Sequence, residues 1–278
     1  MSIARVRDDR VLRGTRWLAV FVIPFLVVAS VMLFFWPQDT GRLFAWPIKP
    51  FMTAMMLAAA YMGGIYFFSA VVLASRWHTI KTGFLPVFTF ASLLGIATLL
   101  HWDRFTHGHV SFYAWAGLYF IAPFLVLAAW LLNRRTDPIV LATGDVEIPS
   151  LLRWLVGVVG VITVIIALLL FIRPDLMLAV WPWKLTPLTA RVAGAMFALP
   201  GIVGLGIAAD RRWSAARIIL QAQAFSILVI LIAAARAWGD FDLSSPASYL
   251  FVGGLAGLLV GIAVLYISME TRLKRGGQ

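Results

Sequence analysis

The sequence predicts an all-α, polytopic integral membrane protein, with eight transmembrane helices arranged as a tandem parallel repeat of two four-helix units. Composition is the first reason: 62% of the 278 residues are hydrophobic and only 13% are charged, whereas a soluble domain is about half apolar and a quarter charged. The mean hydropathy is +0.93. The second reason is the presence of long apolar stretches, and the third is a duplication within the chain.

Eight stretches approach the roughly 20 apolar residues that a membrane-spanning helix needs. In chain order they cover residues 17–36, 51–74, 84–101, 110–132, 151–172, 188–209, 214–235 and 248–268. The first follows a basic segment, as a signal peptide does, but it is too long for a typical signal sequence. It also corresponds to 151–172 in the second half, so we expect it to be a retained helix.

The two halves of the chain share residues at an offset of 135 to 136 positions. The matched residues are Trp46-Pro47 with Trp181-Pro182, Lys49 with Lys184, Arg76-Trp77 with Arg212-Trp213, Trp102 with Trp238, Phe105 with Phe241, and Tyr113 with Tyr249. Four helices per unit give both units the same orientation, which is a parallel repeat. The predicted parts are a basic N-terminus (1–16), the first repeat (17–133), a linker (134–150), the second repeat (151–268) and a basic C-terminus (269–278).

The basic residues are distributed unevenly between alternate loops. Sixteen Lys and Arg fall on the side of the termini and linker, and seven fall on the other side when Arg191 is included. The positive-inside rule therefore places both termini in the cytoplasm. An arginine-rich, asparagine-poor composition favours a bacterial inner membrane. The net charge of +11 sets orientation and meets anionic headgroups, and we expect no nucleic-acid partner because no soluble basic domain is present.

Several kinds of chemistry are excluded or disfavoured by the sequence. The absence of cysteine excludes disulfides, thiolate metal sites and a cysteine nucleophile. No phosphate-binding loop, dinucleotide fingerprint or His-Glu-x-x-His pattern occurs, so we expect no cofactor and disfavour an enzyme. All 12 acidic residues lie in termini, loops or helix ends, which argues against a transporter coupled to ions through buried carboxylates.

The duplicated loop between the first and second helix of each repeat is the first candidate site. Trp46 and Lys49 in one copy match Trp181 and Lys184 in the other. Tryptophan favours the membrane interface, so a purely structural anchor explains the loops. The functional alternative is a paired outer pocket with tryptophan walls and lysines that bind a phosphate or carboxylate. Short amphipathic turns are expected at 42–45 and 176–180.

Other outer residues extend this candidate ligand site or suggest a metal. Arg191, about one turn into the sixth span, is the charged residue nearest the membrane interior, and Trp102 and Trp238 occupy matched loops. His101, Asp103, His107 and His109 fall within nine residues and include common metal ligands. The matching loop of the second half has no histidine, which weakens the metal interpretation and favours a solvated loop.

Glycines predict where helices approach one another closely. Gly253, Gly257 and Gly261 recur every four residues on one face of the last span, which is typical of helix packing. We expect this face to pack within the chain, or alternatively to form a homodimer seam. Gly157 with Gly160 and Gly201 with Gly204 form weaker small-residue faces.

Three functions are consistent with these features. We favour a protein that binds or moves a lipid or a small apolar or anionic molecule at an outer site between the repeats. The alternative is a non-catalytic subunit or scaffold of a larger membrane complex, which the short loops support. A membrane enzyme with a metal in the histidine loop is the third.

Overall fold

The computed structural model describes residues 7–276, and within that range it contains helices and no strands. Residues 1–6 and 277–278, which belong to the predicted basic termini, lie outside the described part. The α-helices are α1 (Arg13–Phe35), α2 (Thr40–Leu43), α3 (Phe51–Leu73), α4 (Phe84–Leu100), α5 (Val110–Asn133), α6 (Ser150–Ile172), α7 (Pro174–Leu178), α8 (Pro187–Ala209), α9 (Trp213–Arg236) and α10 (Pro246–Gly276).

The predicted all-helical, multi-pass membrane architecture is confirmed. Eight helices of the described chain are long and apolar enough to cross a membrane, and they coincide with the eight predicted stretches. Helix α10 continues past the predicted end at residue 268 to Gly276. Lys274 and Arg275 occupy its last turn, where positive charge is favourable to the helix dipole.

Short helices occupy the loops where brief turns are expected. Helices α2 and α7 begin two residues before the predicted turns at 42–45 and 176–180. Pro174 is the first residue of α7 and Pro187 is the first residue of α8. Proline suits a first helical position because its missing N–H has no intrahelical partner there. The prolines therefore break each loop into a short helix and a new span.

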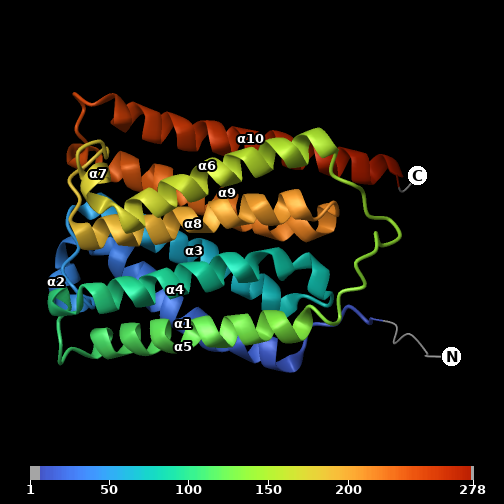
Figure 1. The fold of residues 1–278 in the computed structure, drawn as a ribbon, viewed down its shortest axis with the longest axis horizontal. Coiled ribbons are helices and arrows are strands. Elements are labelled where there is room, and N and C mark those ends of the chain that lie inside the picture. The colour runs from blue at the N-terminus through green and yellow to red at the C-terminus, as the bar shows by residue number, and fades with distance from the viewer. Residues whose placement is uncertain (1–6, 277–278) are drawn as a thin grey trace.

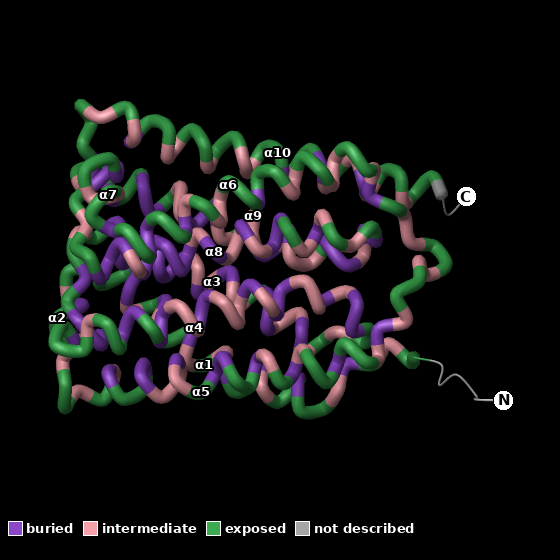
Figure 2. Tube along the Cα trace, in the orientation of Figure 1, coloured by how far each residue is buried: buried purple, intermediate pink, exposed green. Residues whose placement is uncertain are grey.

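The long helices form two layers of four (Figure 1). One layer runs α1, α3, α9, α10 and the other runs α5, α4, α8, α6, each helix packing on the next. The central contacts α3–α9 and α4–α8 each join the first half of the chain to the second. Contacts between the layers are sparser and involve α1 with α5, α3 with α8, and α8 with α9. Buried residues concentrate in α3, α4, α8 and α9 (Figure 2), so the core lies where the halves meet.

The bundle has two ends that differ in chemistry. We call the end with loops 74–83, 134–149 and 210–212 the linker end, and residues 7–12 and the last turns of α10 lie there too. We call the opposite end, with loops 36–50, 101–109, 173–186 and 237–245, the aromatic end. It holds Trp36, Trp46, Trp102, Trp181, Trp183 and Trp238.

The close helix contact lies at the glycines of the two weaker predicted faces and not at those of the last span. A Cβ placed on Gly160 of α6 would lie 2.8 Å from the carbonyl oxygen of Gly201, and one on Gly204 would lie 2.9 Å from the Cα of Gly160. The backbones of α6 and α8 therefore touch. A Cβ on Gly253, Gly257 or Gly261 would meet no described atom within 4 Å. The prediction that this face packs within the chain is wrong, because α10 packs on α9 through other residues; the homodimer seam stays a prediction.

Replacing Gly160 with alanine should destabilise the bundle by about 1–3 kcal/mol, because the added methyl forces two backbones apart. Gly253→Ala is the matched control, since its methyl enters open space and alanine is the better helix former by up to about 1 kcal/mol. Thermal unfolding midpoints in one detergent compare the two variants. A midpoint for Gly160→Ala equal to that of the wild type would contradict the close contact.

Candidate functional site

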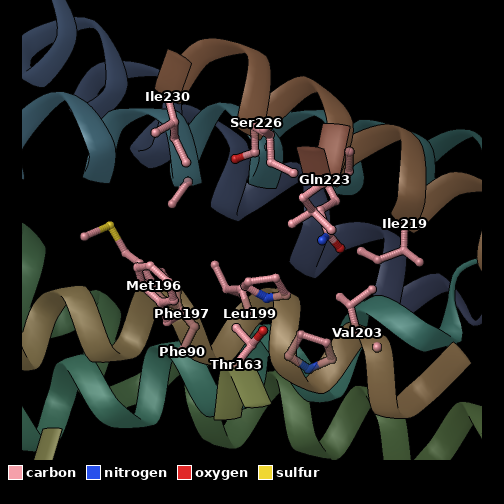
Figure 3. A pocket seen from close by; sticks show the side chains of 18 of the residues that line it. Phe90, Thr163, Met196, Phe197, Leu199, Val203, Ile219, Gln223, Ser226 and Ile230 are labelled. Carbon is pink, nitrogen blue, oxygen red and sulfur yellow. The ribbon is translucent and has the colours of Figure 1, made fainter. Parts of the chain in front are cut away.

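A cavity of about 850 Å³ lies between the two helix layers. Residues of α1, α3, α9 and α10 line it from one layer, and residues of α4, α5, α6 and α8 line it from the other. It runs from Trp181 at the aromatic end to Gly83 and Leu265 toward the linker end. Figure 3 shows part of it, with Ile219, Gln223, Ser226 and Ile230 of α9 on one side and Met196, Leu199 and Val203 of α8 on the other.

The sparse contact between the layers explains this space. Helices within a layer pack closely, as at Gly160 and Gly204, whereas the layers meet through few residues. Gly254 and Gly261 of α10 line the cavity, and a Cβ on either would meet no described atom within 4 Å. Their missing side chains thus widen the cavity on the side of α10. A volume of this size is typical of a ligand pocket.

The cavity wall carries no charged side chain and few polar ones. Tyr119 donates a hydrogen bond to the Tyr61 hydroxyl at 2.7 Å. Thr163 donates to the carbonyl of Val159 at 2.8 Å, and Ser226 donates to the carbonyl of Ala59 at 2.6 Å. The remaining polar groups are the Gln223 amide and the Trp181 indole N–H. Such a wall can hold an uncharged, mostly apolar molecule and offers no counter-charge to an anion.

At the aromatic end, the two tryptophans that were predicted to form the walls of an outer pocket, Trp46 and Trp181, are buried in separate clusters of aromatic side chains. Trp46 is 2% exposed, and its ring lies 4.7 Å from that of Trp115 and 5.0 Å from that of Phe105. Trp181 lies 5.4 Å from the Trp183 ring and 5.6 Å from that of Phe197. Trp181 lines the cavity, whereas Trp46 does not. The structure therefore does not bring the two tryptophans into one outer pocket.

The predicted cationic partners also lie apart from the cavity. Lys49 and Lys184 are exposed on the loops, and neither lines the cavity. Arg191 in the first turn of α8 donates a hydrogen bond from Nη1 to His101 Nε2 at 2.7 Å. Burial, and next the charge of Arg191, lower the pKa of His101. The imidazole is therefore neutral at pH 7 and accepts this bond through its Nε2 lone pair.

The histidine loop does not assemble a metal site in the described residues. His101 binds Arg191, His107 Nε2 donates to the carbonyl of Trp102 at 2.9 Å, and His109 Nδ1 pairs with the Ser111 hydroxyl at 2.6 Å. Asp103 instead pairs with Arg104 in solvent. The imidazoles thus make contacts within the loop and at helix starts. Trp102 and Trp238 are partly exposed; the Trp102 ring is tilted against that of His107, and the Trp238 ring is stacked on that of Phe241.

Sequence reasoning missed a buried charge cluster at the linker end. Arg212 is 3% exposed and donates two hydrogen bonds to the Asp137 carboxylate, at 2.8 and 3.0 Å. It also binds the Asp210 carboxylate, at 2.7 Å through Nη2. Lys81 reaches both carboxylates, at 2.8 and 2.7 Å. The cluster fastens the linker to a loop of each half. The sequence identifies Arg212 as a duplicated residue that corresponds to Arg76, but this correspondence does not predict that Arg212 is buried.

A second polar chain at the linker end joins the two halves through His78. Its Nδ1 pairs with the Asp9 carboxylate, and its Nε2 lies 2.9 Å from the Ser214 hydroxyl. Ser214 in turn binds the Asp145 carboxylate at 2.5 Å. A carboxylate accepts only, so the Ser214 hydrogen points to Asp145 and away from the imidazole. The arrangement therefore links loops and lacks the geometry that activates a serine nucleophile.

Comparisons of the chain with protein-family models, curated proteins and solved structures find no match.

Arg212→Met should lower the free energy of unfolding by about 3–5 kcal/mol, because it leaves two nearly buried carboxylates with Lys81 alone. Arg211→Met is the control, since Arg211 and Glu147 form an exposed pair, with 56% and 50% of their side chains accessible, worth at most about 1 kcal/mol. Thermal unfolding of the two purified variants compares them. Equal midpoints would show that the cluster does not hold the halves together.

The linker-end cluster also predicts the pH dependence of stability. Burial tends to raise the pKa of Asp210, but hydrogen bonds from Arg212 and Lys81 outweigh it and lower that pKa from 3.8 to about 2. The pKa of Asp137 is likewise lowered: its burial is outweighed by the bonds from the same two cations. This stabilisation is complete above the ordinary carboxyl pKa and is lost as the pH falls through the folded-state value.

We therefore expect the unfolding midpoint to stay constant above about pH 5 and to fall toward pH 2. In Arg212→Met the fall should be shallower, because the carboxylates lose their main partner. A pH series of midpoints for both proteins tests this, and parallel curves would contradict the assignment.

Proposed function

We propose that the protein binds an uncharged, largely apolar membrane molecule, such as a neutral lipid, in the cavity between the helix layers. The observation that carries the proposal is the cavity itself, which has the volume of a ligand pocket, lies within the spanning part of the helices and has no charged wall residue. Residues of both halves line it, as expected for a site between repeats. The outer lysines and Arg191 have no part in this site.

The two halves are, in this proposal, a tandem parallel repeat whose axis passes between α3, α4, α8 and α9. Swapped packing supports it: the second helix of each half packs on the third helix of the other. Matching hydrogen bonds support it too. The amide of His78 donates to the Asp9 carboxylate at 3.0 Å, and the amide of Ser214 donates to the Asp145 carboxylate at 3.1 Å. These residues are related by the same offset as the duplicated tryptophans.

The bacterial inner membrane is the compartment we propose, with the linker end in the cytoplasm. The support is the excess of Lys and Arg near that end. A site within the membrane is then open to molecules that dissolve in the bilayer.

A scaffold role is the second proposal, and α10 is the observation that favours it. Among the described helices, α10 packs chiefly on α9, and most of its spanning surface is exposed. A partner subunit, or a second copy of the chain, has room there. In this alternative the cavity is filled by lipid without selectivity.

Two paired substitutions on α10 test the cavity. Gly254→Leu with Gly261→Leu fills it, whereas Gly253→Leu with Gly257→Leu adds the same atoms to the same helix outside it. In native mass spectrometry of protein extracted with its surrounding membrane, we expect a defined neutral lipid on the wild type and the control. The filled variant should retain about ten-fold less, corresponding to about 1.4 kcal/mol.

Equal retention by both variants would overturn the cavity as the binding site. A stoichiometric partner protein without a small ligand would overturn the proposal in favour of the scaffold. A retained lipid with an anionic headgroup would contradict the uncharged wall.

A further inference from the structure

Among the described residues, Gln223 is one of two side chains of the cavity wall that carry a buried polar atom without a hydrogen-bond partner, the other being Trp181 at the aromatic end. Its Oε1 is buried without a hydrogen-bond partner in the described chain. Figure 3 shows the amide reaching from α9 into the space between α9 and α8. The Tyr61–Tyr119 pair, Thr163 and Ser226, by contrast, each have a partner. The unpaired groups are thus Trp181 Nε1 at the aromatic end of the cavity and Gln223 Oε1 near the middle of α9.

An amide without a partner is costly at membrane depth, because neither lipid tails nor water replace the missing bond. A trapped water molecule needs two or more polar partners, and the other unpaired group, Trp181 Nε1, lies at the aromatic end of the cavity, whereas Gln223 lies near the middle of α9. Leucine at this position would avoid the cost. The residue therefore carries a penalty that a bound molecule can remove.

On the basis of the function proposed above, we propose that Gln223 binds the polar group of the ligand, and that this group is a single uncharged hydroxyl or carbonyl at one end of an apolar chain. A primary amide offers one acceptor and two donors, which complement a hydroxyl or a carbonyl. A carboxylate or phosphate is excluded because no cation lines the cavity. The ligand class is a neutral lipid with one small polar head.

Three probes of equal chain length separate these requirements: oleyl alcohol, oleic acid in its ionised form, and the corresponding hydrocarbon. Binding to the detergent-solubilised full chain is measured by native mass spectrometry at matched free concentrations. We expect the wild type to prefer the alcohol over the hydrocarbon about five-fold, which is the size of one neutral hydrogen bond. The ionised acid should bind more weakly than either.

Gln223→Leu should abolish the preference for the alcohol while leaving binding of the hydrocarbon unchanged, and Gln223→Met is a second variant of similar shape. Gln221→Leu is the control, because Gln221 lies two residues away on α9, bonds Tyr66 and Tyr266, and does not line the cavity. Without ligand, Gln223→Leu should unfold at a higher temperature than the wild type, since it removes an unpaired polar group.

The outcomes separate this inference from the function on which it rests. If Gln223→Leu keeps the preference for the alcohol while filling the cavity with Gly254→Leu and Gly261→Leu abolishes binding, the cavity stands and the role of Gln223 is overturned. If the wild type binds the ionised acid best, the neutral-ligand class is overturned. If the filled variant binds all three probes as the wild type does, both proposals fail.

Discussion

The packing of α3 on α9 and of α4 on α8 is the contact on which the rest of the structure depends. Each of these four helices is flanked on its other side by one outer helix of its own half, so the two contacts extend into two four-helix layers. The helices pack closely within each layer, whereas few residues of one layer contact the other layer. The cavity is the consequence. A conventional pair of separate four-helix bundles would instead have filled its own two cores and left no shared space.

Polar contacts at both ends of the bundle maintain this pairing. At the linker end, Arg212 joins two carboxylates on different segments, and His78 connects Asp9 to Ser214. At the aromatic end, Asp240 accepts a hydrogen bond from the amide of Met52, and Trp183 donates one to Thr53. Each of these contacts except the bond to Asp210 spans a large distance in sequence. Charged and hydrogen-bonding groups therefore fix the ends, while the middle is left apolar.

The spans and their order could be predicted because hydrocarbon thickness fixes the length of an apolar run. The site could not. The Gly253–Gly261 spacing is the usual packing signal, yet Gly160 and Gly204 make the close contact; spacing identifies a small-residue face but not the helix opposite it. Trp46 and Trp181 correspond in the sequence, but each packs in a separate aromatic cluster, because a match in sequence does not require two side chains to face one pocket. Asp9 and Asp145 are separated by the same 136 positions as Trp77 and Trp213, so this correspondence is present in the sequence. The unpaired amide of Gln223 could not be predicted, because whether a polar group has a hydrogen-bond partner depends on the folded structure.

The exchange of partners between the halves has a consequence for biosynthesis. Helices α3 and α4 emerge with the first half of the chain, but the helices that cover their inner faces, α9 and α8, are made only later. The first half therefore enters the bilayer with the inner faces of α3 and α4 uncovered, and Lys81 has its two carboxylate partners only after Asp137 and Asp210 are synthesised. The central contacts α3–α9 and α4–α8 can therefore form only after the second half is made, and α10, which follows α9 in the chain, can pack on it only after α9 is made.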